Sequence, residues 1–229
     1  MRRTIPHPSH LKGRRAAALL PLLASINWLF CRVWHRLQVE GEEHIPIRGG
    51  AIVASNHVSS ADPFLLSAPS PRLMVFPMAR EYYELPLCRW FFRFLDAIPV
   101  ERDGRDFAST RKTLQALRSG GLVCIFPEGR IRLAGAPGDG KLGVALFALR
   151  TGVPVIPARI SGTPPTDSIL WGLLTPSRAR VRFGPPVDLA EFRGLPAERE
   201  VLQGATERIM EAIAALAKGE EAAPKPVGR

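Results

Sequence analysis

Residues 51–62 read Ala-Ile-Val-Ala-Ser-Asn-His-Val-Ser-Ser-Ala-Asp, an apolar run that passes directly into a polar loop. The run at 51–55 is continuous rather than alternating, which predicts a strand covered on both faces. His57 and Asp62 follow the run, five positions apart. Imidazole titrates near neutral pH, and a neighbouring carboxylate can fix its tautomer and stabilise the imidazolium. Such a pair can move a proton, but many loops contain a His and an Asp, so its meaning depends on the rest of the chain.

Extended and helical patterns alternate along the body of the chain. Apolar runs predict strands at 51–55, 73–78, 122–126, 153–160 and 179–183. Apolar residues at helical spacing predict helices at 62–67, 84–95, 105–119, 140–151 and 197–218. This alternation favours a single α/β domain with a mostly parallel central sheet flanked by helices. The chain of 229 residues is long enough for such a domain with a substantial core.

The N-terminal segment is basic and then apolar. Arg14 and Arg15 precede an uncharged stretch at 16–31, which Arg32 and Arg36 follow. A helix over this stretch spans about 24 Å, less than the bilayer hydrocarbon core of about 30 Å. Its aromatic and basic end favours a helix lying in one leaflet, with a spanning anchor or a plain core helix as alternatives. We therefore expect a membrane-associating segment at 1–38, a folded domain at 39–218 and a disordered tail at 219–229.

The charge of the chain favours phosphate-bearing partners. Lys and Arg number 31, most of them Arg, against 21 Asp and Glu, so the formal net charge is +10. This balance suits anionic lipid headgroups, nucleotide-containing cofactors or an acidic carrier protein, unless it reflects only a compositional preference for Arg. No zinc spacing or aromatic-interleaved basic motif accompanies it, so nucleic acid is not an expected partner.

Cysteine and histidine positions argue against a disulfide framework and a metal site. Cys31, Cys88 and Cys124 lie far apart in apolar runs, which is typical of core or membrane-facing residues in a reducing compartment. Four of the five His precede position 45, which leaves His57 as the sole imidazole in the body. We expect neither a metal nor a redox cofactor.

A second cluster of polar residues follows the apolar run at 122–126. Residues 126–132 read Phe-Pro-Glu-Gly-Arg-Ile-Arg. Arg can grip a phosphate bidentately, Glu can accept hydrogen bonds from hydroxyls, and Gly allows close backbone approach. The cluster suits a phosphorylated, hydroxyl-bearing substrate, although a polar surface loop with a Glu–Arg pair would look the same.

Two other stretches leave alternatives open or mislead. The apolar stretch at 87–95 with its two Arg predicts either a buried helix or a surface that faces lipid or lines a chain-binding groove.

The stretch at 135–141 has the glycine spacing and Lys of a phosphate-binding loop. Because Leu142 replaces the Ser or Thr that binds Mg²⁺, and no strand directly precedes the loop, we do not expect a nucleotide triphosphatase.

Four sequence blocks occur in a specific order. They are Asn-His-x4-Asp at 56–62, Ala-Ile-Pro-Val-Glu-Arg at 97–102, Phe-Pro-Glu-Gly-Arg at 126–130 and Val-Pro-Val-Ile-Pro at 153–157. One block would be weak, but four in order at suitable spacing are specific. Over roughly residues 40–190 the chain resembles the 1-acyl-sn-glycerol-3-phosphate acyltransferase family of glycerolipid acyltransferases.

The resemblance implies roles for individual residues. It implies that His57 takes the proton from an acceptor hydroxyl, which attacks an acyl thioester directly, and that Asp62 orients and charge-stabilises His57. The sequence has no G-x-S-x-G turn with a nucleophilic Ser, so it does not point to a covalent acyl-enzyme. The residues that the resemblance implies for binding the glycerol phosphate are Arg102, Glu128, Gly129 and Arg130.

The resemblance also implies a reaction and a place. The acceptor would be the sn-2 hydroxyl of 1-acyl-glycerol-3-phosphate. The co-substrate would be acyl-CoA or acyl carrier protein, and the reaction would take place at the cytoplasmic face of the cell membrane. Two departures leave the acceptor open: Asp96 stands where the second block usually opens with Gly, and Arg130 stands where the third usually has Thr. Another lysophospholipid such as lysophosphatidylethanolamine, a non-catalytic lipid-binding protein and a thioester hydrolase are the alternatives.

Overall fold

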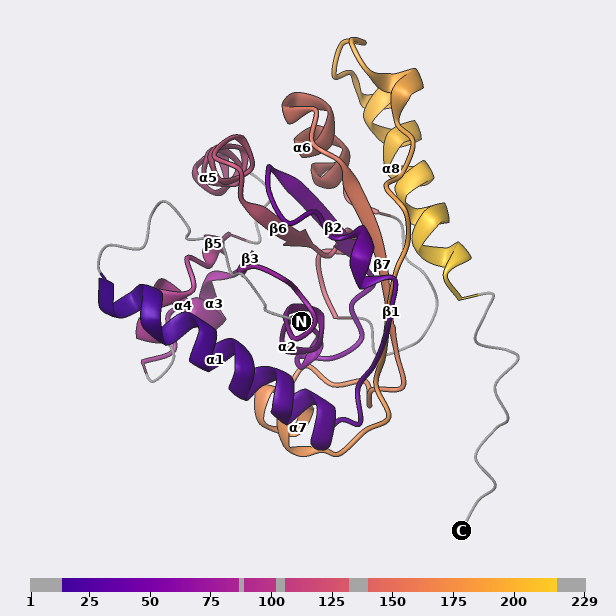
Figure 1. The fold of residues 1–229 in the computed structure, drawn as a ribbon. Coiled ribbons are helices and arrows are strands. Elements are labelled where there is room, and N and C mark those ends of the chain that lie inside the picture. Colours follow the sequence, from indigo (N-terminus) through magenta and orange to yellow (C-terminus); the bar gives the residue numbers. More distant parts are fainter. Residues whose placement is uncertain (1–13, 87–88, 102–105, 132–139, 218–229) are drawn as a thin grey trace.

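Parallel strands form the centre of the main sheet in the computed structural model, which describes residues 14–86, 89–101, 106–131 and 140–217 (Figure 1). The strands of this sheet are β1 (Gln38–Glu40), β2 (Ala51–Ser55), β3 (Met74–Val75), β6 (Leu122–Ile125), β7 (Val155–Ser161) and β8 (Arg180–Phe183). Within the described part they follow the order β1-β8-β7-β2-β6-β3. β7, β2, β6 and β3 are parallel, β8 is antiparallel to β7, and β1 is parallel to β8. The predicted mostly parallel α/β sheet is confirmed.

Helices cover both faces of this sheet (Figure 1). On one side lie α1 (Arg14–Val33), α2 (Asp62–Ser67) and α7 (Ile169–Leu174), and on the other α5 (Phe107–Arg118), α6 (Gly143–Thr151) and α8 (Arg199–Ala215). The remaining elements are η1 (Glu42–His44), β4 (Pro77–Ala79), α3 (Arg80–Tyr83), α4 (Arg89–Phe94), β5 (Ile98–Val100) and η2 (Ala190–Phe192).

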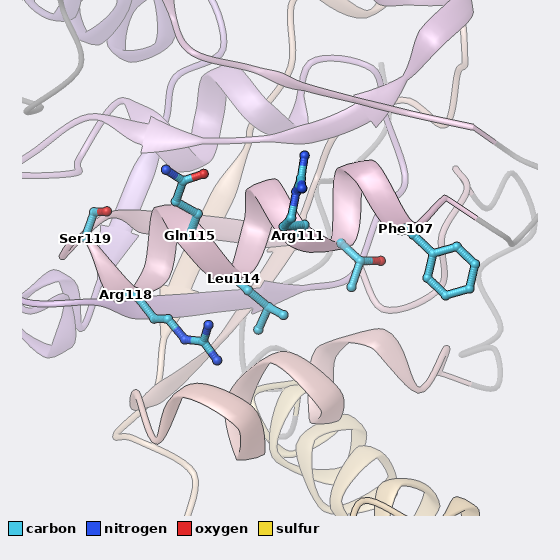
Figure 2. A pocket seen from close by; sticks show the side chains of 7 residues that line it. Phe107, Arg111, Leu114, Gln115, Arg118 and Ser119 are labelled. Carbon is cyan, nitrogen blue, oxygen red and sulfur yellow. The ribbon is translucent and has the colours of Figure 1, made fainter.

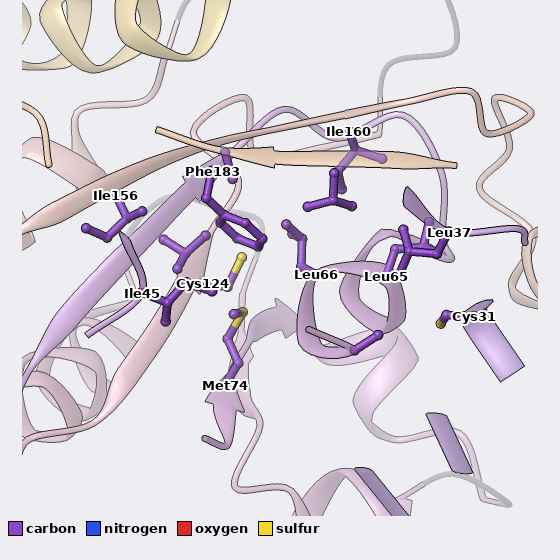
Figure 3. Packing of buried hydrophobic residues seen from close by; sticks show 14 of the residues in the cluster. Cys31, Leu37, Ile45, Leu65, Leu66, Met74, Cys124, Ile156, Ile160 and Phe183 are labelled. Carbon is purple, nitrogen blue, oxygen red and sulfur yellow. The ribbon is translucent and has the colours of Figure 1, made fainter. Parts of the chain in front are cut away.

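The buried strand β2 contributes side chains to the apolar clusters on both faces of the sheet. Ala51 and Val53 belong to one apolar cluster, and Ile52 and Ala54 belong to the other. Since successive side chains of a strand point to opposite faces, a fully apolar strand is buried only where helices pack on both sides. Figure 3 shows the first cluster, in which Leu66 of α2 lies against the sheet. Each such fully buried Leu or Ile contributes about 1.5–3 kcal/mol to stability.

Helix α1 packs on α2 by one side only. Asn27 Nδ2 donates a hydrogen bond of 2.9 Å to Phe64 O, and Cys31 is fully buried in the first cluster. The opposite side of α1 carries exposed Leu22, Ile26 and Leu29. In the described residues no helix is long and apolar enough to cross a bilayer. Membrane association of this segment stays a prediction, and the predicted tail at 219–229 lies outside the described residues.

The predicted strand at 73–78 is wrong in its extent. β3 ends at Val75 and joins the main sheet, whereas β4 begins at Pro77 and pairs with β5 in a separate two-stranded sheet. Proline has no N–H to donate to a sheet ladder, so the pairing of β3 with β6 does not continue through Pro77.

The predicted helix at 84–95 is also wrong in its start. Residues 84–86 are not helical, and α4 covers only Arg89–Phe94 in the described part. Pro86 explains the break, because a proline removes a helical hydrogen bond and restricts the residue before it. The interpretation as a buried helix fails as well, since none of the residues of α4 is buried and Trp90 is 69% exposed.

Candidate active site

The polar loop after β2 is organised around one buried carboxylate. Asp62 begins α2 and is fully buried, and its Oδ2 lies 2.9 Å from His57 Nδ1. The same oxygen accepts backbone hydrogen bonds from Val58 N at 2.7 Å and Ser59 N at 2.9 Å. A carboxylate can only accept, so His57 Nδ1 carries the proton and donates it, and the lone pair of the neutral ring lies on Nε2. Asp62 thus fixes both the loop and the tautomer of His57.

The first residue of the loop fastens it to the neighbouring strand. Asn56 Nδ2 donates to Ile160 O at 2.9 Å, and Asn56 Oδ1 accepts from Ile160 N at 2.8 Å. Both bonds extend the β2–β7 ladder by one step through a side chain. The backbone of the loop is therefore free to leave the sheet at His57 without breaking the pairing of β7. Sequence reasoning gave Asn56 no role of its own.

We expect Asn56→Ala to lower the free energy of unfolding by about 2 kcal/mol, because the two backbone groups of Ile160 lose their partners. Urea denaturation followed by circular dichroism measures the change. Gln203→Ala is the matched control, since the Gln203 side chain donates to Glu207 on an exposed surface and its removal should cost little. Equal stability of the two variants would show that the strand connection is unimportant.

The second polar cluster meets the first because β2 and β6 are parallel neighbours. Ala54 pairs with Ile125, so the residues that follow both strands emerge at the same edge of the sheet. There the rings of His57 and Phe126 stack, with centroids 3.9 Å apart and planes inclined by 13°. His57 is held by the stack on one ring face and by Asp62 at its edge, and its side chain keeps 15% exposure.

The turn after Phe126 brings further charged groups to this edge. Glu128 is buried, Gly129 adopts a φ of 68°, and Arg130 is exposed. A Cβ at Gly129 would lie 2.6 Å from Lys141 Nζ, so glycine here meets both the left-handed backbone and the close approach of Lys141. Lys141 N also donates to Pro127 O at 2.7 Å. Lys141 is the lysine of the glycine-rich stretch at 135–141, and its position beside the turn was missed.

The second sequence block is only partly described. Arg102, a predicted phosphate ligand, lies outside the described residues. The preceding Glu101 forms an ion pair with Arg80, and its backbone N donates to Asp106 Oδ2 at 2.9 Å. Asp96 has a φ of 54°, a left-handed conformation that glycine adopts freely and Asp tolerates better than most residues. The departure from Gly at this position is therefore compatible with the backbone.

Buried thiols near the site are protonated. Burial, with a further contribution from the charge of Asp62, raises the pKa of Cys124, and burial alone raises the pKa of Cys31 to about 12. Neither thiol forms a disulfide, and Cys88 lies outside the described residues. A thiol held protonated is a poor nucleophile, so neither Cys31 nor Cys124 is a candidate for a covalent intermediate.

A shallow hollow of about 440 Å³ runs along α5, away from these groups (Figure 2). None of the predicted site residues lines it. Its lining comes from α5 and the residue after it: Phe107, Thr110, Arg111, Leu114, Gln115, Arg118 and Ser119. We assign the hollow no part in the site.

The fold and the His57–Asp62 pair define an α/β protein with a largely buried His–Asp pair at the carboxyl edge of its parallel strands, where ligands of such sheets bind. Residues 36–161 match the acyltransferase family, which is more than half of the chain. The chain belongs to that family. The match contains β2, the His57–Asp62 pair and the turn at 126–130, so the family resemblance drawn from the four blocks is confirmed.

Relatives and a solved structure agree with this assignment. The chloroplastic 1-acyl-sn-glycerol-3-phosphate acyltransferase LPAT1 of Arabidopsis thaliana is 28% identical over 160 residues, which cover 67% of this chain and 44% of that protein. The 1-acyl-sn-glycerol-3-phosphate acyltransferase of Pseudomonas aeruginosa is 28% identical over 198 residues, covering 82% of this chain and 76% of the relative. The chain thus spans less than half the length of the Arabidopsis protein. The crystal structure of PlsC from Thermotoga maritima, a 1-acyl-sn-glycerophosphate acyltransferase, shares the fold with a TM-score of 0.74 at 24% identity, covering 94% of this chain and 86% of that one.

Proposed function

We propose that this chain transfers a fatty acyl group from an acyl thioester to the sn-2 hydroxyl of 1-acyl-glycerol-3-phosphate. The observation that carries the proposal is the His57–Asp62 pair, in which Asp62 holds the imidazole by Nδ1 at the carboxyl edge of the sheet. The names of several relatives support this acceptor. The co-substrate is acyl-CoA or acyl carrier protein, and neither a metal nor another cofactor enters the scheme.

His57 would act through Nε2, the ring nitrogen that faces away from Asp62. The acceptor hydroxyl gives its proton to Nε2 while its oxygen attacks the thioester carbonyl carbon. The tetrahedral intermediate then collapses, the C–S bond breaks, and the leaving thiolate takes the proton from the imidazolium. Asp62 stabilises the imidazolium between these two steps. No acyl-enzyme forms, which agrees with the protonated state of Cys31 and Cys124.

The acceptor phosphate would lie at the turn after Phe126. Arg130 is exposed there, and the amine of Lys141 lies over Gly129, so two cations can face one phosphate. Gly129 leaves room for the Lys141 side chain at this turn, and Glu128 would accept a hydrogen bond from a glycerol hydroxyl. Arg102 would complete the phosphate site. A larger headgroup such as phosphoethanolamine is the alternative, because Arg130 replaces the Thr that usually stands at this position.

The acceptor and the product are lipids, so we propose that the enzyme works at the cytoplasmic face of the cell membrane. The exposed apolar side of α1, with Leu22, Ile26 and Leu29, supports insertion of this helix into one leaflet. Membrane lipids and the lysophospholipid are then the partners, together with the acyl donor.

An acceptor panel tests the proposed reaction. The purified protein receives labelled acyl-CoA or acyl carrier protein with lysophosphatidic acid, with lysophosphatidylethanolamine or with neither lipid. We expect phosphatidic acid as the main product. Transfer to lysophosphatidylethanolamine alone would replace the acceptor, and free fatty acid as the main product would indicate a thioester hydrolase.

We expect Arg130→Ala to raise KM for lysophosphatidic acid by about 10- to 100-fold, because a charge-assisted hydrogen bond to phosphate contributes about 1.5–3 kcal/mol. KM for the acyl donor should change little. Steady-state kinetics with each substrate varied in turn separates the two effects. Arg150→Ala is the control, since Arg150 is also an exposed arginine and lies on α6. An unchanged acceptor KM in Arg130→Ala would remove Arg130 from the phosphate site.

A further inference from the structure

The outward side of α7 is apolar and exposed. Leu170, Trp171 and Leu174 are 69%, 70% and 63% exposed. On a helix surface Leu174 neighbours both Leu170, four positions before it, and Trp171, three positions before it. Large apolar side chains that gather on a surface in this way mark a site of interaction. The sequence patterns predicted no element here, so this side of the protein had no assigned role.

The inward side of α7 contacts the loop that carries the catalytic pair. Gly172 is buried, and a Cβ there would lie 2.2 Å from Ser60 Oγ and 3.1 Å from Ala61 N. Ser60 Oγ donates to Ser168 O at 2.7 Å, directly before α7. Ser60 N donates to Thr166 O at 2.9 Å. Whatever binds the outer side of α7 is therefore separated from the His57–Asp62 loop by the thickness of one short helix.

The apolar side of α7 continues towards the end of α1. His35 Nδ1 lies 2.9 Å from Ser177 Oγ, and Ala179 N donates to His35 O at 2.9 Å, so the segment after α7 is joined to the residues after α1. In Figure 1 the C-terminal end of α1 lies beside α7. This end of α1 exposes Val33 and Trp34 by 65% and 42%. We call Leu170, Trp171 and Leu174 the α7 surface; Val33 and Trp34 add exposed apolar side chains at the end of α1.

The charged residues in the segments near the α7 surface are mostly basic and favour an anionic partner. Arg36 and Arg178 are exposed in the segments that follow α1 and α7, and Asp167 is the single acidic residue between positions 162 and 180. Tryptophan with flanking arginine fits the interface between headgroups and hydrocarbon, with the arginines at anionic phosphates.

We propose that the α7 surface docks on an anionic lipid bilayer and holds the His57–Asp62 loop at the lipid–water interface. This inference rests on the proposed acyl transfer at a membrane and adds a second contact to the one made by α1. A lysolipid acceptor that leaves the bilayer beside α7 reaches the catalytic loop without crossing bulk water. The surface thus favours acceptors that reside in the membrane over the same headgroup in solution.

Vesicle binding tests the surface independently of the reaction. The double variant Trp171→Ser/Leu174→Ser and the wild type are sedimented with vesicles of phosphatidylglycerol and phosphatidylcholine, and with vesicles of phosphatidylcholine alone. We expect the partition coefficient of the double variant on anionic vesicles to fall by about tenfold or more, because partial burial of two large apolar side chains is lost. The wild type should bind neutral vesicles more weakly.

Leu195→Ser is the matched control, since Leu195 is 51% exposed ahead of α8, the helix that covers the opposite side of the sheet (Figure 1). It should bind vesicles like the wild type. Equal partition of the double variant and the wild type would overturn the inference, and so would a wild type that does not bind vesicles. A dimer in light scattering that the double variant loses, with vesicle binding unchanged, would assign the surface to a second copy of the chain instead.

A second measurement links the surface to turnover. With a long-chain lysophosphatidic acid in vesicles, the rate of the double variant should fall about tenfold, in parallel with binding. With a short-chain, monomeric lysophosphatidic acid, its rate should equal that of the wild type. Equal loss on both acceptors would contradict the docking role. If no form of the protein transfers acyl groups to any acceptor, the proposed function fails, while the vesicle measurement still decides on the surface.

Discussion

Replacing His57 by Ala should lower the rate of acyl transfer by about 10²- to 10⁴-fold, the range that a positioned general base supplies. The ring is held by Asp62 at Nδ1 and by the stack on Phe126, so Nε2 is presented in one orientation. A small side chain removes the base without disturbing these partners much. The loss should appear in kcat, because the proton transfer occurs in the transition state and not in substrate binding.

The control for this change is His44→Ala, which removes another imidazole of the described chain, at the end of η1 and outside the site. It should retain full activity. Binding of His57→Ala to vesicles should match that of the wild type. If His57→Ala keeps its turnover, the mechanism is wrong and a non-catalytic lipid-binding protein becomes the better description. If both variants lose activity together, the loss reflects stability and not the base.

The sequence was most informative where burial left little choice. The continuous apolar runs at 51–55 and 122–126 became the adjacent parallel strands β2 and β6. Their adjacency brings two polar segments, some 70 positions apart in the chain, to one edge of the sheet. His57 and Phe126 could not be joined by sequence alone, because their contact depends on the order of strands, which local patterns do not encode.

Short elements and contacts made by tertiary structure were less predictable. Helix α7 has six residues, too few for a helical period to stand out, although Ser168 at its start is a recognisable cap that accepts from Trp171 N. In the sequence Lys141 fits only the pattern of a phosphate-binding loop, because its approach to Gly129 follows from the tertiary path of the chain. Pro77 and Pro86 are the residues at which the apolar and helical patterns of the sequence depart from the real boundaries of β3 and α4.

Replacing Asp62 by Asn should impair both activity and stability. Asp62 Oδ2 accepts from His57 and from two backbone N–H groups, and Oδ1 is buried without a hydrogen-bond partner among the described residues. In the variant, the amide oxygen can serve the backbone donors only if the NH2 group takes the place of Oδ1. That group is then a buried donor without an acceptor, which costs about 1–3 kcal/mol of unfolding free energy.

Catalysis should suffer more than folding in this variant. Asn cannot stabilise the imidazolium by charge, and its oxygen holds Nδ1–H more weakly than a carboxylate does. We expect a loss in kcat of about 10²- to 10⁴-fold, close to that of His57→Ala, since the two residues act as one unit. The double variant should therefore be little worse than either single one, which kcat measured for all three proteins will show.

Asp188→Asn is the matched control for the carboxylate. Asp188 Oδ1 also accepts a backbone hydrogen bond, from Ala190 N at 2.9 Å, but on an exposed loop outside the site. Its replacement should leave kcat unchanged and shift the unfolding free energy by less than about 0.5 kcal/mol. Multiplicative losses in the His57→Ala/Asp62→Asn double variant would mean that Asp62 acts independently of His57. The role of the carboxylate would then be to order the loop through its hydrogen bonds with Val58 N and Ser59 N, and not to orient His57.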